Sequence, residues 1–168
     1  MKDLSIHRYK TLVLIKPDGV ERGLVGEILK RFENRGLKIC GMKMLAPSRK
    51  LAEAHYYDVV VRHGKVIAEG LIKYLSEGVV IAIVLEGVEA IKVVRAMCGT
   101  TYPNESAPGT IRGDYCHISK DYANNNTLTV RNIIHASADE KDAKRELKLW
   151  FKPNELVKYS RVDEIHIW

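Results

Sequence analysis

The sequence predicts an α+β fold in which a strand–helix–strand unit occurs twice. Three observations lead to this prediction: the length is 168 residues, about one domain; apolar strand-like runs alternate with amphipathic helical stretches; and no linker or internal repeat divides the chain. Hydrophobic residues make up 46% and charged residues 29% of the chain, as in ordinary globular proteins. This composition excludes collagen, coiled coils and intrinsically disordered proteins. We therefore treat residues 1–168 as a single domain.

The first third of the chain predicts two strands with a helix between them. Residues Lys10–Lys16 form a short, mostly apolar run, and the Pro17-Asp18-Gly19 sequence after it is typical of a turn. Apolar side chains then recur at helical spacing over residues 25–32, and Gly36 is suited to end that helix. Residues 37–46 alternate well enough in polarity to form a second strand.

The middle of the chain predicts a pair of helices, a strand and a further helix. Ser48 is a candidate N-cap for a helix that begins near Leu51, and a second short helix is expected over Ile67–Leu75. Residues Val79–Leu85 are apolar without interruption, which indicates a strand buried on both faces. Helical spacing returns between Val88 and Cys98.

The last part predicts one more strand and one more helix. Asn132–His135 is a short apolar element, and the Ser137–Glu140 segment matches the Ser-x-x-Glu capping box that opens a helix. Ala143, Leu147 and Trp150 share one face of that helix. The resulting order is the outline of a ferredoxin-like sandwich, a four-stranded antiparallel sheet (β-α-β-β-α-β) with surrounding helices. A parallel α/β sheet is the alternative, because the pattern alone does not define strand direction.

Membrane insertion and secretion are not expected from the sequence. The longest apolar run, Val79–Leu85, is too short for a bilayer, which takes about 20 residues. The first ten residues carry charges but no apolar stretch, so we expect no secretory signal. Cys40, Cys98 and Cys116 are odd in number and form no Cys-x-x-Cys motif, which favours a reducing compartment. We expect a cytoplasmic protein.

The net charge of +6 has two interpretations. It is either an ordinary solvated surface or the sign of a polyanionic partner, such as nucleic acid or a phosphorylated ligand. No block of five or six like charges is present, and no aromatic-studded RNA-binding strand is seen. The sequence also lacks the P-loop, the Gly-x-Gly-x-x-Gly fingerprint, the His-Glu-x-x-His zinc motif and the Gly-x-Ser-x-Gly elbow. Any chemistry must use another arrangement.

His135 is the first candidate for that chemistry. A histidine in an apolar setting is usually structural, but this one lies just before a predicted helix, whose first N–H groups favour an anion. A neutral imidazole is also a competent nucleophile near neutral pH. Glu146, on the same predicted helix, could bond the ring directly or through Ser137. We therefore predict a nucleophilic histidine with a supporting carboxylate.

Three basic residues have the chemistry to bind a triphosphate. Lys16 directly follows the first buried strand, Arg95 lies near the end of a predicted helix, and Arg112 lies in the Pro-Gly-Thr-Ile-Arg-Gly-Asp segment. Arginine suits bidentate phosphate contacts, whereas lysine acts as a point charge. Most of the 27 basic residues are expected to be solvated surface charges, but a lysine directly after a buried strand is not well explained in that way.

Five segments, in order, resemble the nucleoside diphosphate kinase family. They are Lys16–Val20 with Arg22–Gly26, His55-Tyr56, Pro108–Asp114, Asn132–Ser137 with its Asn-x-x-His-x-Ser signature, and Glu146–Trp150. The resemblance runs from about Lys10 to Tyr159, which is nearly the whole chain. It implies a ping-pong phosphotransferase that moves the γ-phosphate of a nucleoside triphosphate such as ATP to a histidine and then to a different nucleoside diphosphate.

The resemblance also implies roles for individual residues. His135 matches the phosphorylated histidine, and Ser137 and Glu146 match its supporting pair. The positions that contact the nucleotide are matched by Lys16, Tyr56, Arg95, Thr101, Arg112 and Asn132. Mg²⁺ is expected on the nucleotide phosphates, and Asp58 could hold one of its waters. The family forms homo-oligomers, hexamers or tetramers built from a common dimer. We expect no membrane and no dedicated nucleic-acid partner.

Two segments depart from the family pattern. Residues Arg62–Gly70 are slightly longer than usual and lack the aromatic ring on which the family stacks the base, so Val66 or Ile67 is expected to make an aliphatic contact instead. Residues Ile118–Val130 are also longer than usual, and their Asn-rich polarity predicts a surface hairpin or loop. A second functional hypothesis is a catalytically idle relative that binds nucleic acid or regulates another protein; a third is a structural oligomer subunit.

Overall fold

A computed structural model describes residues 7–126 and 128–167. Its sheet contains β1 (Arg8–Ile15), β2 (Lys38–Leu45), β3 (Val80–Val88) and β4 (Ile134–Ala136). The strands lie in the order β2-β3-β1-β4, and every neighbouring pair is antiparallel. This is the predicted ferredoxin-like sandwich, and the parallel alternative is wrong.

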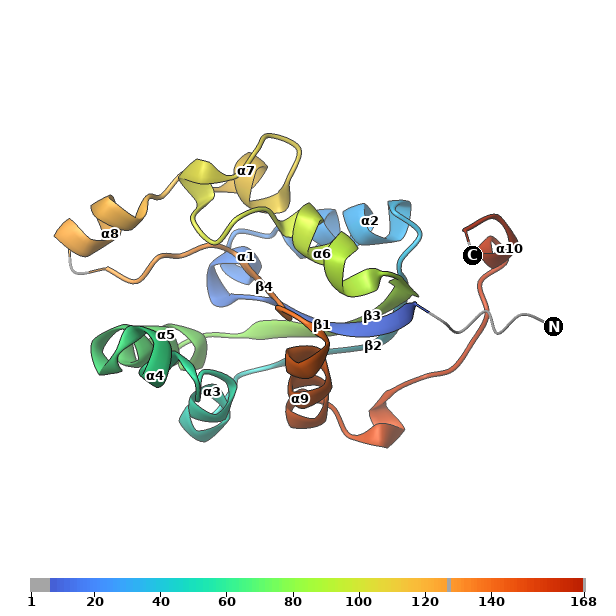
Figure 1. The fold of residues 1–168 in the computed structure, drawn as a ribbon, viewed down its shortest axis with the longest axis horizontal. Coiled ribbons are helices and arrows are strands. Elements are labelled where there is room, and N and C mark those ends of the chain that lie inside the picture. Colours follow the sequence, from blue (N-terminus) through green and yellow to red (C-terminus); the bar gives the residue numbers. More distant parts are fainter. Residues whose placement is uncertain (1–6, 127, 168) are drawn as a thin grey trace.

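The helices lie in two layers, one on each face of the sheet. In chain order they are α1 (Pro17–Glu21), α2 (Val25–Asn34), α3 (Arg49–His55), α4 (Val59–His63), α5 (Lys65–Ser76), α6 (Ala90–Cys98), α7 (Ile111–Tyr115), α8 (Lys120–Asn125), α9 (Glu140–Trp150) and α10 (Glu164–Ile167), with 3₁₀ turns at Pro103–Glu105 and Pro153–Glu155. Helices α2 and α6 cover one face, and α3, α4, α5 and α9 cover the other (Figure 1). None of the described helices has the length and apolarity needed to cross a bilayer.

The two sides of β1 belong to two separate hydrophobic cores. Val13 and Ile15 pack in the core under α2 and α6, while Leu12 and Leu14 pack in the core under α3, α5 and α9. All four side chains are fully buried. Strand β3 is buried on both faces in the same way, which confirms the interpretation of its unbroken apolar run.

Two predicted helix boundaries are confirmed by their local chemistry. The Ser48 hydroxyl accepts a hydrogen bond from the Leu51 backbone N–H at 3.2 Å and caps α3. Gly36 follows α2 with φ of +83°, a left-handed conformation that glycine adopts with little strain.

The predicted capping box at Ser137–Glu140 is wrong. Asp139 is the N-cap of α9, and its carboxylate accepts from the Asp142 N–H at 2.8 Å. The Ser137 side chain is fully buried and its hydroxyl donates to Glu146 instead. The Ser137 N–H donates to the Leu12 carbonyl, so the chain keeps pairing with β1 past β4 and the helix begins only at Glu140.

The prediction of a hairpin or loop over Ile118–Val130 is wrong for residues Lys120–Asn125. These residues form helix α8, whose N-cap Ser119 accepts from the Tyr122 N–H at 3.0 Å. Polar residues can form such a helix because the hydroxyl cap satisfies one of its first N–H groups and Ala123 is buried beneath it. Thr127, at the end of the Asn-rich run, lies outside the described residues.

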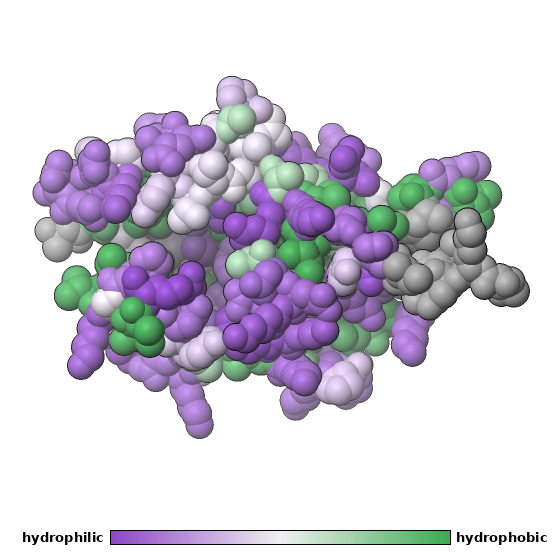
Figure 2. Space-filling view, viewed as in Figure 1, coloured by the Kyte–Doolittle hydropathy of each residue, from purple (hydrophilic) through white to green (hydrophobic). Residues whose placement is uncertain are grey.

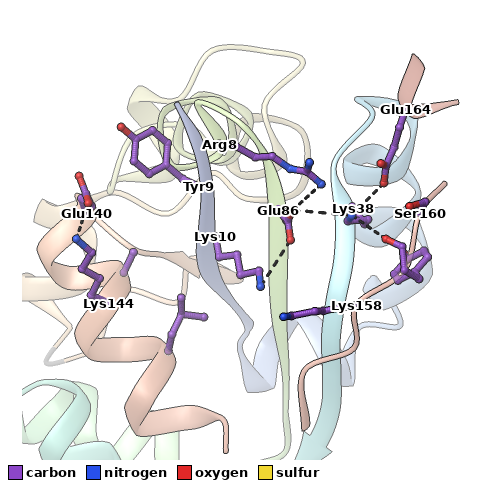
Figure 3. Close-up of a pocket in the computed structure, with 13 residues that line it drawn as sticks. Arg8, Tyr9, Lys10, Lys38, Glu86, Glu140, Lys144, Lys158, Ser160 and Glu164 are labelled. Atoms are coloured by element: carbon purple, nitrogen blue, oxygen red, sulfur yellow. Dashed lines mark hydrogen bonds and ion pairs between the residues drawn. The ribbon is translucent and has the colours of Figure 1, made fainter. Parts of the chain in front are cut away.

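The sheet end where β1 begins carries a charged network around a polar pocket of about 730 Å³ (Figure 3). The strand register places Lys10 and Lys38 on either side of Glu86. Lys38 Nζ donates to Glu164 Oε1 and to the Tyr159 carbonyl, each at 2.9 Å. These contacts hold the C-terminal segment against the sheet.

Candidate active site

His135 lies in the centre of β4, opposite Leu14 of β1. Its Nε2 is 2.9 Å from Glu146 Oε2, and the Ser137 hydroxyl donates to the same oxygen at 2.7 Å. Helix α9 provides the carboxylate, while β4 and the residue after it provide the ring and the hydroxyl. The predicted supporting pair, Ser137 and Glu146, is therefore brought to the histidine, and the carboxylate bonds both.

The charge on Glu146 determines which ring nitrogen is free. Burial opposes ionisation of this carboxyl group, but the adjacent His135 and the hydrogen bonds from the ring and from Ser137 lower its pKa to about 2. An ionised carboxylate only accepts hydrogen bonds, so His135 Nε2 carries the ring proton. In the neutral ring, the lone pair is therefore on Nδ1. With its side chain 21% exposed, His135 can reach a substrate.

The backbone just before His135 is bent into a tight turn. Ile133 has φ of +64°, which is rare for a β-branched residue, and the Ile134 N–H donates to the Asn132 carbonyl at 2.7 Å. Asp18 Oδ2 accepts from the Ile133 N–H at 3.1 Å, and the Tyr74 hydroxyl donates to Oδ1 of the same carboxylate. Asp18 thus supports the turn, a role that its place in the Lys-Pro-Asp-Gly-Val segment did not reveal.

Lys16 and Asn132 form one buried unit. Lys16 Nζ donates to Asn132 Oδ1 at 2.8 Å, and Asn132 Nδ2 donates to the Thr101 carbonyl at 2.9 Å. Burial, together with the nearby Arg112 charge, lowers the pKa of Lys16 to about 8. The Asn132 amide, expected to contact the nucleotide, therefore also positions the ammonium group.

Arg112 joins the loop after α6 to the turn before His135. Its guanidinium donates to the carbonyls of Gly99 at 2.9 Å, Thr100 at 2.8 Å, Ile134 at 2.6 Å and Asn132 at 3.3 Å. Four carbonyl oxygens spread around one planar fork hold it in a single orientation. The residue therefore provides a fixed positive charge and also connects two parts of the site.

The remaining predicted residues lie around this centre. Tyr56 is buried, and its ring lies 4.7 Å from that of His55, which in turn contacts His135. Arg95 and Thr101 are exposed. Burial and the nearby charge of Arg95 lower the pKa of Arg112. The Thr101 carbonyl accepts from the Asn132 amide. Tyr56 follows α3, Arg95 is on α6, and Thr101 is in the loop after α6.

The side chains that could hold a metal ion next to His135 do not suit Mg²⁺. His55, His135 and Glu146 offer two nitrogens and one oxygen within 4.8 Å of one another. Mg²⁺ prefers oxygen ligands in an octahedral arrangement and keeps several waters. Asp58 offers a carboxylate elsewhere: Arg62 Nη2 lies 2.7 Å from its Oδ2, and its side chain is 27% exposed. That oxygen chemistry suits a magnesium-bound water.

The molecular surface is hollowed between the region of α8 and that of α4 and α5 (Figure 2). Thr129, after α8, approaches α5 so closely that its hydroxyl would lie 2.7 Å from a Cβ at Gly70. The Arg131 guanidinium lies 5.6 Å from the centre of the Tyr74 ring. The longer segment before the signature therefore packs on α5 beside the site.

Comparison with known proteins identifies the family. A family model described as nucleoside diphosphate kinase matches residues 9–156. A nucleoside diphosphate kinase of Borreliella burgdorferi is 49% identical over 157 residues, which cover 92% of this chain and 94% of the relative. The chain belongs to the nucleoside diphosphate kinase family. A nucleoside diphosphate kinase of Pyrococcus furiosus is 48% identical over 90% of this chain and 88% of the relative.

Solved structures of nucleoside diphosphate kinases have the same fold. The Borrelia burgdorferi enzyme, in a transition-state mimic with bound vanadate and ADP, is 47% identical, covers 97% of this chain and 98% of that one, and has a TM-score of 0.95. A Halobacterium salinarum enzyme in complex with CDP is 37% identical, covers 96% and 99% of the two chains, and has a TM-score of 0.84. The protein is accordingly an enzyme, a nucleoside diphosphate kinase that transfers a phosphoryl group between nucleotides. The hypotheses of an idle relative and of a purely structural subunit are not supported.

Proposed function

We propose that the phosphoryl group passes through Nδ1 of His135. The Nδ1 lone pair attacks the γ-phosphorus of a nucleoside triphosphate such as ATP, and the bond from phosphorus to the bridging oxygen breaks with its electron pair on the departing diphosphate. In the second half, a β-phosphate oxygen of another nucleoside diphosphate attacks the same phosphorus, and the P–N bond returns its pair to Nδ1. The observation that carries this proposal is the contact of the ionised Glu146 with Nε2, which places the lone pair of the neutral ring on Nδ1.

The other site residues would position the phosphates and neutralise their charge. Phosphoryl transfer depends on positioning and on stabilising charge at the equatorial oxygens more than on covalent help. Lys16 and Arg112 supply two fixed cations that share hydrogen bonds with Asn132. The other proposed substrate contacts are the Arg95 charge and the hydroxyls of Tyr56 and Thr101.

Mg²⁺ is proposed as the cofactor, carried on the nucleotide phosphates. When bound, it neutralises phosphate charge and holds the phosphate oxygens in the reactive arrangement. Asp58 is the residue of this chain that fits a water of the ion, because it offers a partly exposed carboxylate. Arg62 fixes the orientation of that carboxylate.

Labelling with radioactive γ-phosphate tests the proposed intermediate. Incubation with labelled ATP in the absence of a second nucleotide is expected to leave one phosphate per chain on His135. The adduct should be labile in acid and stable in alkali, as a phosphoramidate is, and peptide mapping should locate it. A label that survives acid, or one that maps to another residue, would rule out the proposed route.

The activity is expected to fall as the pH rises through about 8, because Lys16 loses its proton there. The sign follows from the lowered pKa: the ammonium is charged below this pH and neutral above it. We expect kcat/KM, which reports on the free enzyme, to decline toward tenfold per pH unit on the basic side. An arginine at this position stays charged over the same pH range, so kcat/KM of a Lys16→Arg variant should not decline on the basic side. A flat profile in the wild type between about pH 7 and 10 would contradict the assignment.

The base is proposed to pack on Ile67 rather than on Val66. Ile67 lies on the same face of α5 as Gly70 and Tyr74, the residues that approach Thr129 and Arg131 at the site. Val66 instead lines a separate hollow of about 500 Å³ with residues of α4 and α5. The half-exposed Ile67 side chain is therefore the aliphatic surface available to a base.

Such a surface should discriminate weakly among bases. We expect the KM values for ADP, GDP, CDP and dTDP to lie within about tenfold of one another, because stacking on a ring adds only ~0.5–1.5 kcal/mol and an aliphatic contact adds less. Ile67→Phe should lower the KM for purines, and Val66→Phe, on the other face, serves as the control. A strong preference of the wild type for one base would instead indicate contacts from α8 and Asn124–Asn126.

A homo-oligomer, either hexamer or tetramer, and a cytoplasmic location complete the proposal. Strand β2 is an edge of the sheet, and Met42 and Met44 on it are 53% and 63% exposed, which suits burial against another copy.

Cys40, Cys98 and Cys116 are free thiols, in keeping with a reducing compartment. The proposed partners are ATP and nucleoside diphosphates, with no membrane and no dedicated nucleic acid. Light scattering on the purified protein would give the number of subunits.

A further inference from the structure

His55 is held rigidly against the catalytic histidine. It ends α3, is 2% exposed, and its ring centre lies 4.5 Å from that of His135, with the two planes at 82°. The rings of Tyr56 and Trp150 contact it edge-on at 4.7 Å and 5.6 Å. With a ring on three sides, His55 has a single orientation beside the nucleophile.

The hydrogen bond from Trp150 determines the tautomer of His55. An indole N–H only donates, and Trp150 Nε1 lies 3.2 Å from His55 Nδ1, so Nδ1 is the acceptor. Burial, reinforced by the neighbouring His135, lowers the pKa of His55 well below 6.5, so the ring is neutral. The one ring proton is therefore on Nε2.

This Nε2–H group is buried and lacks an acceptor within residues 7–126 and 128–167. The Tyr56 hydroxyl, on the next residue, is in the same state. Buried donors are nearly always satisfied, and an unsatisfied one is destabilising. Two such donors on consecutive residues, one of them in the ring that packs on His135, indicate a site for an acceptor-rich ligand.

The orientation of the two histidines relates this donor to the reaction. His55 Nδ1 is 4.0 Å from Glu146 Oε1, and His135 Nε2 is 2.9 Å from Glu146 Oε2. These contacts, together with the one from Trp150, occupy Nδ1 of His55 and Nε2 of His135, so one nitrogen of each ring remains available. These nitrogens are His55 Nε2, with a proton to donate, and His135 Nδ1, with a lone pair.

We propose that the Nε2–H of His55 donates a hydrogen bond to an oxygen of the phosphoryl group carried by His135. This inference rests on the proposed phosphohistidine and adds His55 to its catalytic residues. A phosphoryl group offers three acceptor oxygens, and a donor already oriented by Trp150 needs no rearrangement when charge develops on them. His55 is then a neutral donor that complements the Lys16 charge.

Two substitutions separate donation from packing. In His55→Asn, the amide oxygen can still accept from Trp150, but no donor reaches the position of Nε2. In His55→Gln, the longer amide places an N–H close to that position. Phosphorylation of each variant by ATP is measured in a single turnover, together with the dissociation constant for ADP and the gain in melting temperature on phosphorylation.

We expect His55→Asn to be phosphorylated at least about tenfold more slowly than the wild type, with ADP binding changed less than about twofold, since a bond to a charged acceptor is stronger than a neutral one. His55→Gln should recover most of the rate. Phosphorylation should raise the melting temperature of the wild type and His55→Gln more than that of His55→Asn.

Three results would overturn this inference: a wild-type rate in His55→Asn, equal losses in both variants, or equal gains in melting temperature on phosphorylation. Each would mean that His55 only packs against the site. Measuring the wild type beside the variants distinguishes a failure of this inference from a failure of the proposed phosphohistidine. If the wild type itself forms no phosphohistidine on His135, the proposed route fails first, whatever the variants do.

Discussion

The His135→Ala variant is expected to lose phosphotransfer almost completely, to below about 1% of wild-type turnover, because it removes the proposed nucleophile and the other imidazole of the site, that of His55, is buried. A coupled assay with ATP and a second nucleoside diphosphate measures the loss. The fold should persist, since β4 is an edge strand and the Ser137–Glu146 hydrogen bond does not depend on the ring. Nucleotide binding should therefore be largely retained.

The exposed His117 provides a matched control for this experiment. His117→Ala removes an imidazole from the same chain without touching β4 or α9, and it should keep the wild-type rate. More than a few per cent of wild-type turnover in His135→Ala, with a folded protein, would show that another group carries the phosphate.

The Arg112→Ala variant should lower kcat/KM by at least about tenfold. A hydrogen bond to a charged group contributes ~1.5–3 kcal/mol, and ~1.4 kcal/mol corresponds to tenfold. The structure adds a second reason: removing the guanidinium leaves the carbonyls of Gly99, Thr100 and Ile134 without this donor. We therefore expect a lower melting temperature as well as slower catalysis, measured by steady-state kinetics and thermal unfolding.

Arg112→Lys separates the two contributions. The lysine keeps a positive charge but lacks the planar guanidinium that donates to several carbonyls at once. Arg112→Lys should therefore recover kcat/KM better than it recovers the melting temperature. Arg35, exposed after α2, provides the control, and Arg35→Ala should leave both quantities unchanged. If the kinetics of Arg112→Ala stay within twofold of the wild type, Arg112 does not contact the phosphates.

The strands and main helices were predictable because their signals are local. Unbroken apolar runs at β1 and β3, helical spacing in α2 and a hydroxyl cap at Ser48 each depend on residues close in sequence. The short helices α1, α4 and α7 were not predicted, because a single turn shows too little periodicity. The α8 region was assigned as a hairpin or loop, since its polarity outweighed the cap at Ser119.

The proposed catalytic histidine and the proposed phosphate-binding residues could be named from their motifs, but their contacts could not. Ser137 matched a capping box, yet a buried hydroxyl beside an ionised carboxylate bonds that carboxylate rather than the start of a helix. His55 was noticed as part of a motif, but its buried N–H became apparent only with Trp150 placed against the ring. Asp18 was part of a predicted turn, and the strained backbone that it supports lies 115 residues further along the chain.

By itself, the sequence determined the α+β class, the order of the strands and main helices, the family motifs and the candidate nucleophile, because periodicity and short motifs are properties of neighbouring residues. Only the tertiary structure decided which nitrogen of His135 is free, which face of α5 meets the site, and which carbonyls the Arg112 guanidinium binds. Lys16 and Asn132 are 116 residues apart and share one hydrogen bond. Such contacts form only when antiparallel pairing of β1 with β3 and β4 brings distant segments together, and burial then sets the charges of the groups enclosed.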